Sequence, residues 1–145
     1  MKSNKIIKGI LLPFLLVTVS VCIIYSSCKH EPTPPPPPPI PTGTNITPDG
    51  ICFQENILPI IQSNCAISGC HDGTGEENFS LSNYSNIMAS EIVKAGNPSE
   101  SKLYKVLIAS PNSEEFMPPS PYLPLTSDQI GLIYWWISQG ALDNP

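Results

Sequence analysis

The sequence contains no arginine, and all seven of its basic residues are lysines. From residue 28 onward, four lysines face twelve carboxylates, which gives this part of the chain a formal charge of −8. An acidic balance of this kind argues against binding to nucleic acid or to an anionic lipid surface. A protein partner that is guided by charge is therefore expected to be basic at its contact surface.

Other signals are absent as well. The chain has no Ser-His-Asp set, no glycine-rich phosphate loop and no internal repeat, and it has only two histidines, His30 and His71. No stretch alternates apolar and polar residues over a length that would predict a strand. We therefore expect an all-α domain with long loops, and we expect it not to be an enzyme.

The N-terminus has the layout of a secretory signal. Residues 1–27 start with lysines, continue with the apolar run GILLPFLLVTVSVCII and end in small residues. Ser26-Ser27-Cys28 resembles a bacterial lipobox, which predicts cleavage before Cys28 and lipidation of its thiol. The alternative is an uncleaved anchor over residues 9–27. Both alternatives predict a cell-envelope protein tethered to the inner or outer membrane and facing the periplasm or the outside.

Residues 28–49 are predicted to form a linker, because nine prolines lie between Pro32 and Pro48. Such a segment favours a polyproline II spacer, and at about 3.1 Å per residue the stretch from Pro32 to Pro41 would be roughly 30 Å long. Residues 50–145 remain as one domain. A domain of this size benefits from a cofactor, a metal or a disulfide.

Three segments of this domain have helical patterns. We expect one helix before residue 65 that is kinked or restarted at Pro59, and a second that opens at Asn97-Pro98. A capping box of Thr126 and Gln129 predicts the start of the last helix, and Gly140 predicts its end. The apolar residues at helical spacing are Phe53, Ile57 and Ile60 or Ile61; Leu103, Val106 and Leu107; and Ile130, Ile133, Tyr134 and Ile137.

The stretch CAISGCH places two cysteines and a histidine together at Cys65, Cys70 and His71. Cys-x-x-Cys-His is the attachment signature of a c-type haem, in which both thiols bond the porphyrin edge and the histidine binds iron. Here four residues separate the cysteines, so Cys65 must reach its vinyl group across a longer loop. Gly69 can give that loop the unusual backbone angles that it needs.

Met117 is the best candidate for a second axial ligand. It lies in the polar, proline-rich stretch FMPPSP, where a methionine is unexpected unless the loop folds over something apolar. Met/His ligation raises the reduction potential relative to bis-His ligation. His30 lies in the linker, and Met88 lies in an apolar stretch that suits core packing. A loop methionine that only covers the core is the alternative.

Two other interpretations of the cysteines stay open. Cys52, Cys65, Cys70 and His71 have the right number and type of ligands for a zinc site. A Cys65–Cys70 disulfide would suit an exported protein. Either would make the domain an exported structural or binding module. In the haem interpretation Cys52 is left over and is either buried behind Phe53 or paired with another chain; we expect it to be buried.

Three stretches, CFQENILPIIQSNCAISGCH, IVKAGNPSESKLYKVL and MPPSPYLPLTSDQIGLIYWWISQGA, resemble the small cytochrome c domain called the planctomycete type, which also occurs in lipoproteins of Bacteroidetes. The resemblance covers nearly all of residues 50–141. It implies three to four short helices with long loops around one covalent haem c. It further implies thioether bonds from Cys65 and Cys70, His71 as the proximal iron ligand, Met117 as the distal one, and a packing role for Trp136.

The expected function is that of a membrane-tethered monohaem c-type cytochrome that exchanges electrons with redox partner proteins outside the cytoplasm. If Met117 does not bind iron, a peroxidase or a ligand sensor is the expected variant. Because arginine is absent, the haem propionates would be met by backbone amides, water, Tyr or Trp side chains, or one of Lys94, Lys102 and Lys105.

Overall fold

The computed structural model describes residues 36–39, 50–75 and 79–145. The predicted signal peptide over residues 1–27, the predicted lipidation site Cys28 and most of the linker lie outside these residues. Within the linker, residues 36–39 form neither helix nor strand. No helix in the described ranges is both long enough and apolar enough to cross a bilayer.

The domain over residues 50–145 is built from short helices. In the part of it that the structure describes there is no strand, and only a single antiparallel bridge joins Asp72 to Ser80. This confirms the all-α expectation. The elements are a π-helical turn η2 (Phe53–Ile57), α2 (Leu58–Asn64), α3 (Tyr84–Ala89), a 3₁₀ turn η3 (Pro98–Glu100), α4 (Lys102–Ile108) and α5 (Ser127–Ser138).

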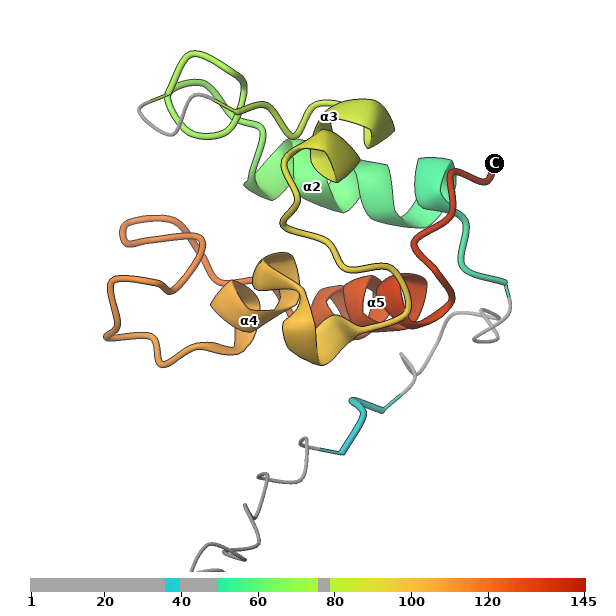
Figure 1. The fold of residues 1–145 in the computed structure, drawn as a ribbon. Coiled ribbons are helices and arrows are strands. Elements are labelled where there is room, and N and C mark those ends of the chain that lie inside the picture. Colours follow the sequence, from blue (N-terminus) through green and yellow to red (C-terminus); the bar gives the residue numbers. More distant parts are fainter. Residues whose placement is uncertain (1–35, 40–49, 76–78) are drawn as a thin grey trace, which may run out of the picture. The chain divides into compact units, whose positions relative to one another are not determined.

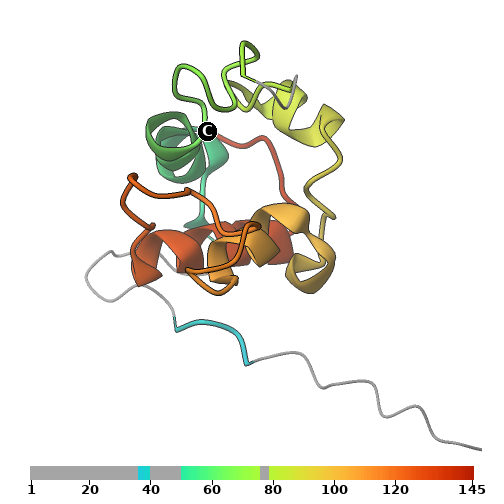
Figure 2. The same cartoon turned by 90° about the vertical axis from the view of Figure 1, so that its left-hand side faces the viewer.

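The helices lie in two groups. Helices α2 and α3 form one side of the domain, and α4 and α5 form the other (Figure 1). The view turned by 90° shows the same grouping (Figure 2). Two loops, the one that follows α2 and the one between α4 and α5, extend from the same side of the domain in Figure 1. Segments some fifty residues apart in the sequence thereby come to the same side of the domain.

The first helix changes its geometry next to its proline. Across the wide turn of η2, the backbone N–H of Leu58 donates to the carbonyl of Phe53. Pro59 then occupies the first turn of α2, where its missing N–H leaves no bond unmade. The predicted restart at Pro59 is confirmed as a change from π to α winding one residue earlier. Phe53, Ile57 and Ile61 are all fully buried, as their spacing predicts.

The helix predicted to open at Asn97-Pro98 is not continuous. Pro98 begins a single 3₁₀ turn, and α4 starts only at Lys102. Between them, Ser101 is extended and fully buried, and its hydroxyl accepts from the N–H of Lys94 at 2.8 Å and donates to the carbonyl of Asn97 at 2.9 Å. The prediction of the helix start was wrong because these bonds hold Ser101 out of a helical conformation.

The last helix follows its prediction closely. The hydroxyl of Thr126 accepts from the N–H of Gln129 at 3.2 Å, and the side chain of Gln129 accepts from the N–H of Thr126 at 2.9 Å. Gly140 follows the helix with a φ of +100°, a conformation that favours glycine. Ile133 and Ile137 are fully buried, so α5 presents its predicted apolar face to the core.

Trp136 lies at the centre of that core, which confirms its packing role. It is 1% exposed, its ring lies 5.3 Å from the ring of Phe53, and its Nε1 donates to the carbonyl of Leu142 at 3.0 Å. Phe53 also meets Tyr84 edge-on at 5.2 Å. Aromatic pairs of this kind contribute about 0.5–1.5 kcal/mol each beyond the area that they bury. The core therefore joins η2, α3 and α5.

The C-terminal segment closes the domain. Asn144 accepts from the N–H of Phe53 at 2.7 Å and donates to the carbonyl of Ile51 at 3.0 Å. Ile51 and Phe53 both face the core, so Cys52 between them, in an extended backbone, faces the other way. Cys52 is half-buried, and the expectation of a fully buried thiol was wrong.

Candidate functional site

The loop after α2 brings the predicted attachment residues together. Cys65 ends α2, where its N–H donates to the carbonyl of Ile61 at 2.8 Å. The chain turns back through Gly69, whose φ is +82°. The N–H of His71 then donates to the carbonyl of Cys65 at 3.1 Å. The four residues between the cysteines thus fold into a closed turn that returns His71 to Cys65.

Residues 79–81 return to His71 and hold it in position. Its carbonyl accepts from the N–H of Leu81 at 2.8 Å, next to the bridge between Asp72 and Ser80. The ring of Phe79 stacks on the imidazole of His71, with centroids 4.5 Å apart and an angle of 25° between the planes. Phe79 therefore orients the imidazole and covers one of its faces.

Residues 72–75 form a turn directly after His71. Both the N–H and the hydroxyl of Thr74 donate to a carboxylate oxygen of Asp72, at 2.9 and 2.7 Å, and these bonds lower the pKa of Asp72. Gly75 lies so close to the loop that a Cβ there would overlap the carbonyl of Cys70. Only glycine fits at this position without a shift of the loop.

Met117 approaches from the other group of helices. Its N–H donates to the carbonyl of Val106 at 3.1 Å, which ties the proline-rich loop to the side of α4. The next residue, Pro118, is buried, and Met117 itself is half-buried. This attachment directs the Met117 side chain toward the loop that carries His71.

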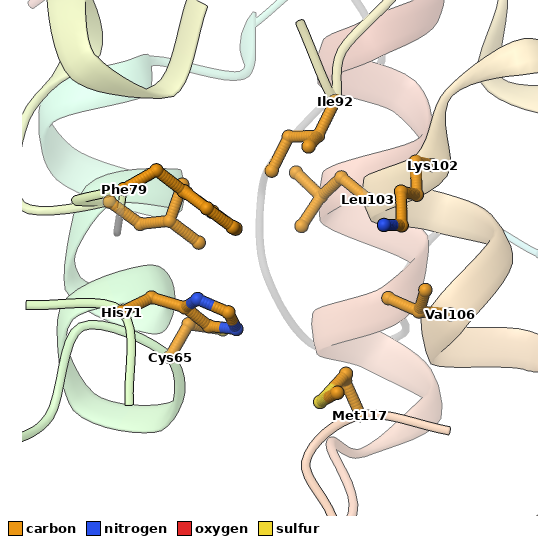
Figure 3. Close-up of a pocket in the computed structure, with 9 residues that line it drawn as sticks. Cys65, His71, Phe79, Ile92, Lys102, Leu103, Val106 and Met117 are labelled. Atoms are coloured by element: carbon orange, nitrogen blue, oxygen red, sulfur yellow. The ribbon is translucent and has the colours of Figure 1, made fainter. Parts of the chain in front are cut away.

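Two adjoining cavities lie between these walls and share Cys65, His71 and Met117. Figure 3 shows His71 and Met117 on opposite walls of the first. This inner cavity, of about 90 Å³, is lined by Cys65, His71, Phe79, Leu81, Ile92, Lys102, Leu103, Val106 and Met117. The loop cavity, of about 300 Å³, is lined by Asn64, Cys65, Ile67, Gly69, Cys70, His71, Met117, Pro118, Pro119 and Tyr122.

The thiols are free and differ in their surroundings. Cys52, Cys65 and Cys70 form no disulfide with one another. Burial, with a smaller contribution from the neighbouring Cys70, raises the pKa of Cys65 to about 11. At neutral pH the Cys65 sulfur is therefore a protonated thiol and a weak nucleophile until something activates it.

The four residues considered as zinc ligands do not lie close together. Cys52 and Cys65 are at opposite ends of a helical segment, which at about 1.5 Å per residue separates them by roughly 20 Å. In the described ranges, no three His, Cys, Asp or Glu side chains are gathered to hold a metal ion. The structure therefore brings His71 and both neighbouring cysteines toward Met117, and leaves Cys52 apart.

Several wall residues were not predicted as part of a site. Phe79 and Leu81 stand in a polar stretch, where the alternation Phe-Ser-Leu is the only signal that both face one side. Ile92 precedes α4 and is held there because its carbonyl accepts from the N–H of Leu103 at 3.0 Å. Lys102 was one of three lysines considered, and it is the one that lines the inner cavity.

Comparison with known proteins adds no identification. No family model matches the chain, and no match was found among the curated proteins or among the solved structures. The function of the site is therefore inferred from the residues and distances described above.

Proposed function

We propose that residues 50–145 hold one covalent haem c and act as an electron-transfer cytochrome domain. The observation that carries the proposal is that His71 and Met117 face each other across a cavity that Cys65 also lines. Imidazole and thioether are the axial pair of cytochromes c. Cys70 lines the adjoining cavity, so both thiols border the same space.

The side chains of the site have the chemical groups that a covalent haem needs. Cys65 and Cys70 are free thiols. Addition of each S–H across a vinyl double bond forms one C–S bond and moves the thiol hydrogen to the neighbouring carbon, so the bond needs no oxidant and releases nothing. His71 and Met117 supply two neutral ligands, and Phe79 holds the imidazole in its orientation.

The apolar walls of the inner cavity would influence the reduction potential of a bound haem. Leu81, Leu103 and Val106 give the space between His71 and Met117 an apolar lining, which disfavours water there. A haem bound there supplies a one-electron Fe(III)/Fe(II) couple. Low polarity and a methionine ligand both favour the less charged ferrous state, so these residues raise the reduction potential. A carrier needs little more than this, and we propose that the protein is an electron carrier and not an enzyme.

The cellular setting is part of the proposal. Export and lipidation at Cys28 would tether the carrier to a membrane of the cell envelope, facing the periplasm or the outside. In the domain over residues 50–145, three lysines stand against ten carboxylates, which favours redox partners that are basic at the contact surface. A disulfide or zinc module gains no comparable support, since its ligands are free or apart.

The test is a haem stain of the denatured protein after expression with a cytochrome c maturation system. The wild type is expected to stain, and the stain is expected to weaken in Cys65→Ala and Cys70→Ala. Cys52→Ala is the matched control and should stain like the wild type. Folded wild-type protein that does not stain would remove the proposal.

A second measurement tests the distal ligand. Wild-type protein is expected to be low-spin with a methionine-to-iron charge-transfer band in the ferric state, and Met117→Ala is expected to lose that band. Met88→Ala is the control, because Met88 packs against the core. A high-spin wild-type spectrum would instead indicate an open position and the peroxidase or sensor variant.

A further inference from the structure

Lys102 is the one formally charged side chain among the residues that line the inner cavity. The other lining residues are aliphatic, aromatic, sulfur-containing or imidazole side chains. Figure 3 shows Lys102 beside Leu103, on the wall opposite His71. Lys102 is exposed overall, which allows its ammonium group to stay hydrated while its stem contacts apolar residues of the wall. A cation at the rim of an apolar cavity gains most from an anion that enters the same cavity.

The other two lysines of the domain are placed differently. Lys94 lines neither the inner cavity nor the loop cavity. Lys105, one turn further along α4, lines an outer cavity of about 440 Å³ together with Glu114 and Glu115. Lys102 also borders that outer cavity, but Lys105 does not reach the inner one. Both lysines share the outer cavity with these two carboxylates, so what sets Lys102 apart is that it also lines the inner cavity.

The two ends of the site fit the two edges of a haem. Cys65, His71 and Met117 belong to both cavities and mark the middle. Cys70 lies at the loop end and Lys102 at the inner end. In a haem, the vinyl groups occupy one edge of the ring and the two propionates occupy the opposite edge. A thioether bond from Cys70 at the loop end would therefore direct the propionates toward the inner end.

We propose that Lys102 pairs with a haem propionate and raises the reduction potential of the domain. This inference rests on the proposed haem function. A positive charge close to the ring disfavours the more positive ferric iron, and the low polarity of the cavity strengthens the effect. Because the chain contains no arginine, Lys102 supplies the positive charge that an arginine side chain could otherwise bring to the propionate.

The experiment compares Lys102→Met with Lys105→Met in the haem-loaded protein by spectroelectrochemical titration. Each substitution removes one positive charge from α4, so a general effect of net charge is the same in both. The midpoint potential is expected to fall more in Lys102→Met than in Lys105→Met, with the larger difference at low salt. Lys102→Arg is expected to restore the wild-type value, and Lys102→Gln is expected to behave like Lys102→Met.

Equal shifts in Lys102→Met and Lys105→Met, or a Lys102→Arg protein that keeps the lowered potential, would overturn the inference. These outcomes leave the proposed function standing, because they require a stained haem protein. Wild-type protein without covalent haem overturns both together. Lys102 is exposed, so the substituted proteins are expected to fold, and circular dichroism of each checks this.

Discussion

The half of the domain around η2 and α5 and the half formed by the two long loops are held together in different ways. In the first, Phe53 and Ile57 are 0% exposed and Trp136 is 1% exposed, and each packs against other side chains. In the second, Met117 and Phe79 are half-buried and line cavities, and Leu123 is 83% exposed. In the core half, the apolar side chains pack against one another. In the loop half, apolar side chains line the inner cavity and the loop cavity instead. Stability and ligand chemistry therefore depend largely on different residues, although Leu81 and Leu103 belong to the core and also line the inner cavity.

Trp136→Ala should give the largest effect, because it removes the side chain at the centre of the core half. We expect a loss of about 3–5 kcal/mol in the free energy of unfolding, measured by urea denaturation. Trp135→Ala is the control, since Trp135 is only half-buried and is expected to cost clearly less. Equal losses in the two variants would show that the core is not centred on Trp136.

Gly75→Ala tests the loop half. The added Cβ would overlap the carbonyl of Cys70, so the turn must shift, at a cost of roughly 1–3 kcal/mol. If the proposed function is right, haem attachment falls as well, because Cys70 moves. Ser68→Ala, at an exposed position in the same loop, serves as the control. An unchanged unfolding curve together with full staining would contradict the tight packing of Gly75.

Thr126→Ala removes half of the capping box of α5. The expected loss is about 1 kcal/mol, with no change in the haem spectrum, because the cap belongs to the core half. Ser127→Ala changes the neighbouring exposed hydroxyl and is expected to leave stability unchanged. A spectral change in Thr126→Ala would mean that the two halves are coupled more closely than their contacts indicate.

The smallest effect concerns pH and appears only in alkaline solution. Burial, and then the charge of Tyr134, raises the pKa of Tyr104 above its ordinary value of 10.0. Below that pH both the folded and the unfolded state keep the proton. As the pH rises through 10, the unfolded chain loses it first, so the free energy of unfolding falls.

Urea unfolding of the wild type and of Tyr104→Phe at pH 9 and pH 11 checks this expectation. The phenylalanine variant should lose less stability than the wild type over that interval. Tyr122→Phe changes a tyrosine that is 47% exposed and should behave like the wild type. If all three proteins lose the same free energy of unfolding between pH 9 and pH 11, the group responsible is not Tyr104.

The core half could be predicted from sequence because its signals are local. Periodic apolar residues and the Thr126–Gln129 box give η2, α2 and α5 their places. The start of α4 could not, since it depends on bonds from Ser101 to the backbone of a preceding segment. The spacing of apolar residues in a helix does not reveal which backbone groups a buried serine will hydrogen-bond.

The four residues proposed to hold the haem could be predicted from the sequence, whereas several residues that line the cavities could not. Cys65, Cys70, His71 and Met117 were all named from motif and spacing, and the structure brings them to two shared cavities. Phe79 and Ile92 were not named, because a single apolar residue in a loop has no periodicity. Their roles follow only from the way in which the chain returns past His71 and α4.

The hydrogen bonds between the side chain of Asn144 and the backbone of Phe53 and Ile51 have a topological consequence. They make the two ends of the domain neighbours, and Figure 1 shows the C-terminus and η2 together, away from the two loops. A short peptide that joins residue 145 to residue 50 should therefore permit circular permutation, with new ends opened in the proline-rich loop. By the same geometry, a fusion partner attached at residue 50 or at residue 145 should leave the face with His71 and Met117 uncovered.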